Sequence, residues 1–133
     1  MSVLTWADVA TGTLPPVDCS QMALSNTIVV LLKPEPVADF LAGLKFHEGR
    51  SGACRAKYVI IGTVSSFEDT YFPVAEATIK PGYWYGVARI RGCVLTTTVA
   101  EKRANNNHKV AWLFDQLSCF GEGVKKKGGG FRG

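Results

Sequence analysis

Residues 83–99 read YWYGVARIRGCVLTTTV, and after a polar hinge residues 105–121 read NNNHKVAWLFDQLSCFG. The first segment is rich in aromatic and β-branched residues, which favours a long strand in an antiparallel sheet. Apolar and basic residues alternate around Arg89 and Arg91, so both arginines are expected on one face while Ala88 and Ile90 face the core. The segment therefore predicts a sheet with one basic face and one apolar face.

The second segment predicts a short amphipathic helix that covers the sheet. Asn107 is a suitable N-cap and Gly121 a suitable stop. At roughly 1.5 Å per residue, about 13 helical residues span only about 20 Å. One such helix cannot cover a sheet of about six strands, so we expect a homodimer in which each helix packs over the sheet of its partner. The apolar stripe at helical spacing would form the dimer interface, and it consists of Val110, Leu113, Phe114 and Leu117.

The rest of the chain predicts further strands and one ambiguous segment. Residues 34–43 fit both a helical stripe and a strand. We favour the strand, as part of a hairpin that joins residues 40–47 to residues 55–64. A helix remains the alternative. The other expected elements are an N-terminal hairpin over residues 1–17, a buried strand over residues 27–32, and a projecting loop or short extra hairpin over residues 65–81. The fold class is therefore α+β.

Charge divides the chain into a neutral domain and a basic tail. The sequence has 133 residues and a net charge of +4, but residues 1–124 carry 11 basic and 11 acidic residues. We therefore expect one domain over residues 1–124 and a basic, Gly-rich tail over residues 125–133, which can attract phosphates by charge alone. The chain contains no apolar run long enough for a membrane span and no signal-peptide pattern, so a cytoplasmic protein is expected.

The cysteines and histidines give no catalytic or metal-binding pattern. The four cysteines lie dozens of residues apart, without a Cys-x-x-Cys pair, and reduced thiols are expected. His108 with Cys119, or His47 with Cys54, lacks the surrounding motif of a nucleophilic site. We expect no enzyme activity, no metal and no cofactor.

The order of elements resembles that of the coat proteins of single-stranded RNA bacteriophages. LKFHEG (44–49) through RAKYVI (55–60) is similar to the central hairpin of that family, and VLTTT (94–98) through LFDQL (113–117) is similar to its passage from strand to helix. The resemblance implies a capsid protein that forms dimers with interlocking helices, assembles into an icosahedral shell and packages single-stranded RNA on the inward sheet face. It also implies a virion that assembles in the host cytoplasm.

The RNA-binding face follows from the basic alternation and from position in that family. It would consist of Lys45, His47, Lys57, Val59, Ile61, Tyr85, Arg89 and Arg91. A different class remains open, a single-stranded nucleic-acid-binding module with an OB-like barrel, in which Tyr83, Trp84 and Tyr85 would stack on bases. Particle size separates the two classes, because a shell is tens of nanometres across.

Overall fold

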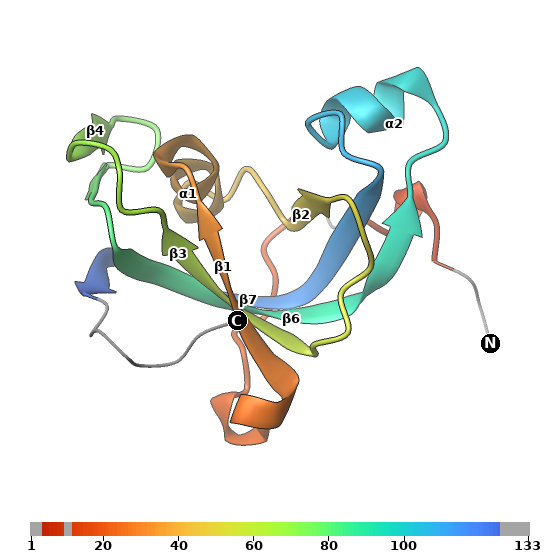
Figure 1. Ribbon diagram of the computed structural model, residues 1–133, viewed down its shortest axis with the longest axis horizontal. Coiled ribbons are helices and arrows are strands. Elements are labelled where there is room, and N and C mark those ends of the chain that lie inside the picture. The colour runs from red at the N-terminus through yellow and green to blue at the C-terminus, as the bar shows by residue number, and fades with distance from the viewer. Residues whose placement is uncertain (1–3, 10–11, 126–133) are drawn as a thin grey trace.

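A computed structural model describes residues 4–9 and 12–125 of the chain (Figure 1). The protein is α+β, with a mostly antiparallel, curled sheet. Its elements are the 3-10 turns η1 (Trp6–Asp8), η2 (Cys19–Gln21) and η3 (Leu24–Asn26), the helices α1 (Pro34–Leu41) and α2 (Val99–Ala104), and the strands β1 (Thr27–Leu32), β2 (His47–Arg50), β3 (Tyr58–Thr63), β4 (Thr70–Phe72), β5 (Ala77–Ile79), β6 (Tyr83–Leu95) and β7 (Val110–Lys125).

The main sheet has five strands in the order β1-β3-β6-β7-β2. β1 pairs in parallel with β3, and every other pair is antiparallel. The long strands β6 and β7 form its centre, and Figure 1 shows α2 at one end of this hairpin and the separate β4–β5 hairpin towards the other. The strand expected over residues 27–32 is confirmed as β1, and the short extra hairpin expected within residues 65–81 is confirmed as β4–β5.

Both faces of the sheet are covered over much of their area. On one face α1 and the β4–β5 hairpin pack on a core that includes Val59, Ile61 and Phe114. On the other face the N-terminal segment packs in two places, with Val17 on one apolar cluster and Leu4, Trp6 and Val9 on another. We call this second face the outer face. Between the two clusters, around Arg89 and Arg91, this face is open to solvent, whereas the alternation predicts a face that is open along its whole length.

The helix expected over residues 107–121 is wrong, because this segment is β7. The strand contains a bulge at Asp115: Arg89 lies opposite Gln116 and Ile90 lies opposite Phe114, so Asp115 has no direct partner. The extra residue keeps Val110, Phe114 and Leu117 against the same core, at spacings of four and three residues. A bulged strand has therefore produced the apolar spacing of a helix.

The segment before β7 also differs from expectation. Asn107 is not an N-cap; Asn106 and Asn107 adopt positive φ angles of 54° and 63° in the turn that precedes β7. The short helix α2 comes earlier and was not expected, and it is capped by Thr98, whose side chain accepts a hydrogen bond from the Glu101 N–H at 3.1 Å. Asparagine tolerates positive φ better than most residues do, so these residues favour a turn as much as a cap.

The strand expected over residues 40–47 and its pairing with residues 55–64 are wrong, and the alternative of a helix over residues 34–43 is right. The strand expected over residues 55–64 is confirmed as β3. Pro34 occupies the first helical turn, where its missing N–H costs nothing, and the helix buries Val37, Ala38 and Phe40. β2 then pairs with β7 and β3 pairs with β1 and β6, so the two segments do not pair with each other. The sequence of residues 48–52 favours a turn, but the pairing of β2 and β3 with strands distant in the sequence decides the fold here.

The N-terminal hairpin is not formed in the described part of the chain. Residues 6–8 form η1, and residues 12–17 carry no strand; the turn expected at residues 11–13 lies partly outside the described residues. Backbone groups here bond to the domain instead, since the Leu117 N–H donates to the Pro15 carbonyl at 3.0 Å and the Val17 N–H donates to Ser118 Oγ at 2.9 Å. The segment is a cover for the outer face.

Candidate nucleic-acid interface

Arg89 and Arg91 lie at the point where the β6–β7 pairing is irregular. Asp115 is the extra residue on β7, and Arg91 is the extra residue on β6, since Ile90 pairs with Phe114 and Gly92 with Leu113. The two bulges compensate each other, so the register is the same on both sides of them. Charged side chains thereby reach solvent in the middle of an otherwise apolar hairpin.

Both arginines are half-exposed and both contact a carboxylate. Arg89 donates from Nε and Nη2 to Asp115 at 2.8 and 2.7 Å, a bidentate pair that raises the pKa of Arg89 and keeps it charged. Arg91 Nη2 lies 3.7 Å from Oδ1 of Asp8 in η1. The arginine side chains keep 41% and 45% of their surface exposed, so neither carboxylate removes them from solvent.

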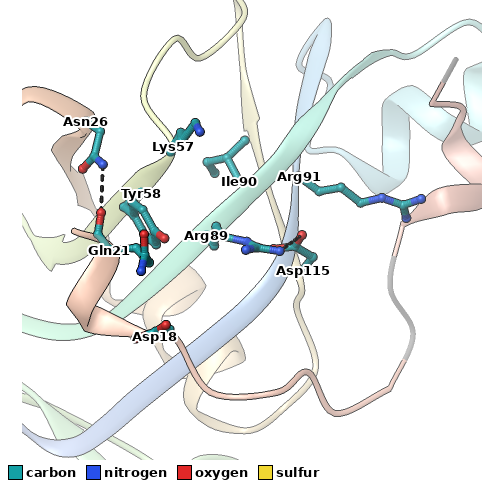
Figure 2. A pocket seen from close by; sticks show the side chains of 9 residues that line it. All are labelled: Asp18, Gln21, Asn26, Lys57, Tyr58, Arg89, Ile90, Arg91 and Asp115. Carbon is teal, nitrogen blue, oxygen red and sulfur yellow. Dashed lines mark hydrogen bonds and ion pairs between the residues drawn. The ribbon is translucent and has the colours of Figure 1, made fainter. Parts of the chain in front are cut away.

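These side chains line an open hollow of about 530 Å³ on the outer face, which we call the arginine groove (Figure 2). η2, η3, the segment before β3, and the strands β6 and β7 all contribute to it. Figure 2 shows Arg89 and Asp115 pointing at each other, and Arg91 extending away from them. The lining residues are Asp18, Gln21, Asn26, Lys57, Tyr58, Arg89, Ile90, Arg91 and Asp115.

Three of the eight residues expected on an RNA-binding face meet in the groove: Lys57, Arg89 and Arg91. Lys57 is exposed and immediately precedes β3, so the alternation of that strand does not direct it into the core. The groove also contains residues that sequence reasoning missed. Asp115 could have been singled out from the sequence, because it is the only charged residue between Val110 and Phe120.

Lys45 and His47 were wrongly placed in the RNA-binding set, because neither lines the groove. Lys45 is buried, with its Nζ 3.2 Å from Glu48 Oε1 and 5.1 Å from the centre of the Phe40 ring. The His47 ring packs edge-on against Trp6, and burial together with the nearby Lys45 charge lowers the pKa of His47 to about 4. His47 is therefore neutral at pH 7 and offers no charge to a phosphate.

Val59, Ile61 and Tyr85 were also wrongly placed, because all three are core residues at 0%, 1% and 1% exposure. The Tyr85 hydroxyl accepts a hydrogen bond from the Lys80 N–H at 2.7 Å. A register shift between Trp84 and Gly86 turns Tyr85 to the face opposite Arg89, although strict alternation puts them together.

The residues expected in a helical dimer interface are core residues of the single chain. Val110, Leu113 and Phe114 are 6%, 1% and 2% exposed, and Leu117 is half-buried. They pack on both sides of β7, since Val110 and Phe114 contact the core under α1 while Leu113 contacts the N-terminal segment. A dimer partner was expected because one helix could not cover the sheet. Since α1 and the N-terminal segment cover it within the single chain, that reason no longer applies.

The aromatic platform of the OB-like alternative is not formed either. Tyr85 is buried, and Trp84 packs on the apolar cluster around Val87 with an indole N–H that has no partner. Tyr83 is half-buried beside Tyr85, at 6.2 Å between ring centres, with Lys80 over its ring. Within residues 4–9 and 12–125, these three aromatic residues form no exposed row of rings for stacking.

Neither a metal-binding cluster nor a membrane-spanning helix occurs among the described residues. Among them no three His, Cys, Asp or Glu side chains cluster as a metal would require, and the four cysteines are free thiols. No helix in the described part is both long and apolar enough to span a membrane. Comparisons of the chain with family models, with curated proteins and with solved structures gave no match.

Proposed function

We propose that this protein binds single-stranded RNA through the arginine groove, with the basic C-terminal residues adding charge. One observation carries the proposal: Lys57, Arg89 and Arg91 come from separate positions in the chain to one open hollow. Guanidinium groups bind phosphate oxygens in a fork, and such contacts supply most of the affinity of a non-specific nucleic-acid-binding protein.

The form of the groove favours a single strand over a duplex. A hollow of about 530 Å³ accommodates one or two nucleotides, and three cations do not reach across two backbones. The amide of Gln21 lies beside the cations and offers a donor and an acceptor to the edge of an unpaired base, whereas the Asn26 amide already bonds to Ala23, Thr27 and the Gln21 carbonyl. A groove of this composition predicts modest affinity with little sequence preference.

A binding titration tests the proposal. A fluorescent ten-nucleotide oligouridine is titrated with the protein and with a Lys57→Ala, Arg91→Ala double variant, at several salt concentrations. Loss of two phosphate contacts is expected to weaken binding about tenfold at low salt and to reduce the slope of log affinity against log salt by about 1.4. Lys102→Ala, Lys109→Ala is the matched control, because both lysines are exposed and lie outside the groove. Equal affinities for the two double variants would contradict the proposal.

A second candidate is a coat protein that assembles around RNA in a virion in the host cytoplasm. Two observations favour self-association: Tyr71 and Val74 are 59% and 55% exposed on or beside the β4–β5 hairpin, and the edge strand β1 is uncharged with Leu31 45% exposed. Exposed apolar groups on a projecting hairpin and an uncharged sheet edge favour contact with other chains. Dimers and shells would then form through these surfaces, since residues 110–125 are a strand and not a helix.

Particle size tests this second candidate. Light scattering and negative-stain microscopy of the purified protein with RNA are expected to show particles of tens of nanometres. A Tyr71→Ser, Val74→Ser variant is expected to keep the RNA affinity of the unchanged protein and to lose the particles. A monomer at micromolar concentration, with or without RNA, would exclude the coat-protein function and leave RNA binding standing.

A further inference from the structure

Each arginine of the groove is already paired with a carboxylate in the free protein. Asp115 holds Arg89 through two hydrogen bonds, and Asp8 lies 3.7 Å from Arg91. A phosphate that binds these guanidiniums must therefore replace a carboxylate or share the cation with it. The two carboxylates differ in how they can respond.

Asp115 lies on a paired strand of the sheet and Asp8 does not. Asp115 belongs to β7 and faces Arg89 across the central hairpin, so the pair cannot separate widely while the sheet is intact. Asp8 belongs to η1, which makes no strand pairing with the sheet in the described part of the chain. The single 3.7 Å contact between Asp8 and Arg91 is weaker than the bidentate pair of Asp115 with Arg89, so it is the contact that opens more readily.

Side-chain packing holds Asp8 at this position. Trp6 and Val9, on either side of it, pack on the cluster of Val94, Ala111 and Leu113, and Leu4 lies so close over Gly92 that a Cβ there would overlap it. Asp8 Oδ2 also accepts a hydrogen bond from the Thr5 N–H at 2.7 Å, which leaves Oδ1 for Arg91. The apolar contacts of η1 thus bring a negative charge to the edge of the groove.

We propose that Asp8 is an intramolecular competitor that occupies the phosphate position on Arg91 and lowers the affinity of the groove for single-stranded nucleic acid. This inference rests on the proposed function and describes how the same site is regulated. The backbone phosphate of a bound strand takes the place of the Asp8 carboxylate, and η1 then loses its polar contact with β6.

Asp8→Asn tests the competition, because asparagine keeps an oxygen that can accept from the Thr5 N–H but carries no charge. The ten-nucleotide oligouridine is expected to bind this variant two- to five-fold more tightly than the unchanged protein, about the size of one exposed ion pair. Glu68→Gln is the control, because it removes one exposed negative charge outside the groove. In an Arg91→Ala background, Asp8→Asn is expected to change nothing.

A second measurement does not depend on this variant. Acrylamide quenching of Trp6, obtained as the difference between the unchanged protein and Trp6→Phe, is expected to increase when oligouridine binds. If the Glu68→Gln and Asp8→Asn variants bind equally while Arg91→Ala binds weakly, the competition is wrong and RNA binding stands. If no variant binds oligouridine, the proposed function and this inference fail together.

Discussion

Asn105 is the most deeply buried polar side chain near the tip of the β6–β7 hairpin, at 1% exposure. Its Nδ2 donates to the carbonyls of His108 and Val110 at 3.1 and 2.9 Å, and these bonds close the turn that leads into β7. Gly49 lies against it, with space for no Cβ, since a Cβ there would be 2.8 Å from Asn105 Oδ1. One amide therefore joins the turn to the edge strand β2.

Asn105→Ala is expected to lower the free energy of unfolding by about 1–3 kcal/mol, because it removes two hydrogen bonds. The Val110 carbonyl loses this donor, while the His108 carbonyl still accepts from Thr96 Oγ1 at 3.1 Å. Asn106→Gly is the matched control. Asn106 is exposed and has a φ of 54°, which glycine adopts freely. The free energy of unfolding of Asn106→Gly is therefore expected to stay within about 0.5 kcal/mol of that of the unchanged protein. Urea denaturation of both variants measures the difference, and a similar loss in both would contradict the role of the Asn105 side chain.

His47 makes stability depend on pH. Its pKa is about 4 in the folded chain, mainly through burial, and about 6.5 when the chain is unfolded. Between these values the unfolded state binds more protons, so stability is complete above pH 6.5 and falls as the pH drops towards 4. The contribution is at most about 3 kcal/mol. Urea denaturation at pH 6.5 and pH 4.5 is expected to show a smaller difference in His47→Gln; an unchanged difference would show that other groups are responsible.

At the scale of elements, α1 has a larger role than its eight residues suggest. It fills the face of the sheet opposite the arginine groove, and Phe40 stacks on Phe114 of β7 with 5.6 Å between ring centres. Lys45, just after the helix, closes the edge of this core by its ion pair with Glu48. The helix and the central hairpin therefore stabilise each other.

Phe40→Ala is expected to cost about 3–5 kcal/mol, because it removes a ring that is 3% exposed and leaves a cavity against Phe114. Leu44→Ala is the control; Leu44 is 64% exposed, and its loss is expected to change stability by less than about 0.5 kcal/mol. Thermal or urea denaturation compares the two. Equal effects would mean that the contact of α1 with β7 does not stabilise the fold.

At the scale of the whole molecule, the N-terminal segment and η2–η3 cover the outer face on either side of the groove, while β4–β5 projects from the sheet (Figure 1). The domain up to residue 124 has as many acidic as basic residues, and the remaining cations lie from Lys125 onward. In the proposed RNA binding, the groove would position the strand and the C-terminal residues would add positive charge.

Truncation after Val124 is expected to separate these two contributions. Removal of four cations lowers the slope of log affinity against log salt by up to about 2.8, and the remaining slope depends on Lys57 and Arg91. Titration of oligouridine at several salt concentrations measures both slopes. If truncation alone abolishes binding while the Lys57→Ala, Arg91→Ala variant binds normally, the C-terminal residues are the binding element and the groove is not.

The sequence by itself determined which segments are strands where the pattern is local, namely β1, β3 and β6, and it placed Arg89 and Arg91 at the surface. For residues 65–81, where β4–β5 forms, it left a loop and a hairpin as alternatives. Tertiary structure decided the rest. Bulges at Asp115 and Arg91, with a register shift near Tyr85, change which face a residue occupies, and each depends on the partner strand. Periodicity read along one chain assumes an unbroken repeat. The extra residue Asp115 gave β7 the apolar spacing of a helix, and the separate register shift between Trp84 and Gly86 turned Tyr85 to the other face. Burial of Lys45 likewise required Glu48 and Phe40 to be brought beside it.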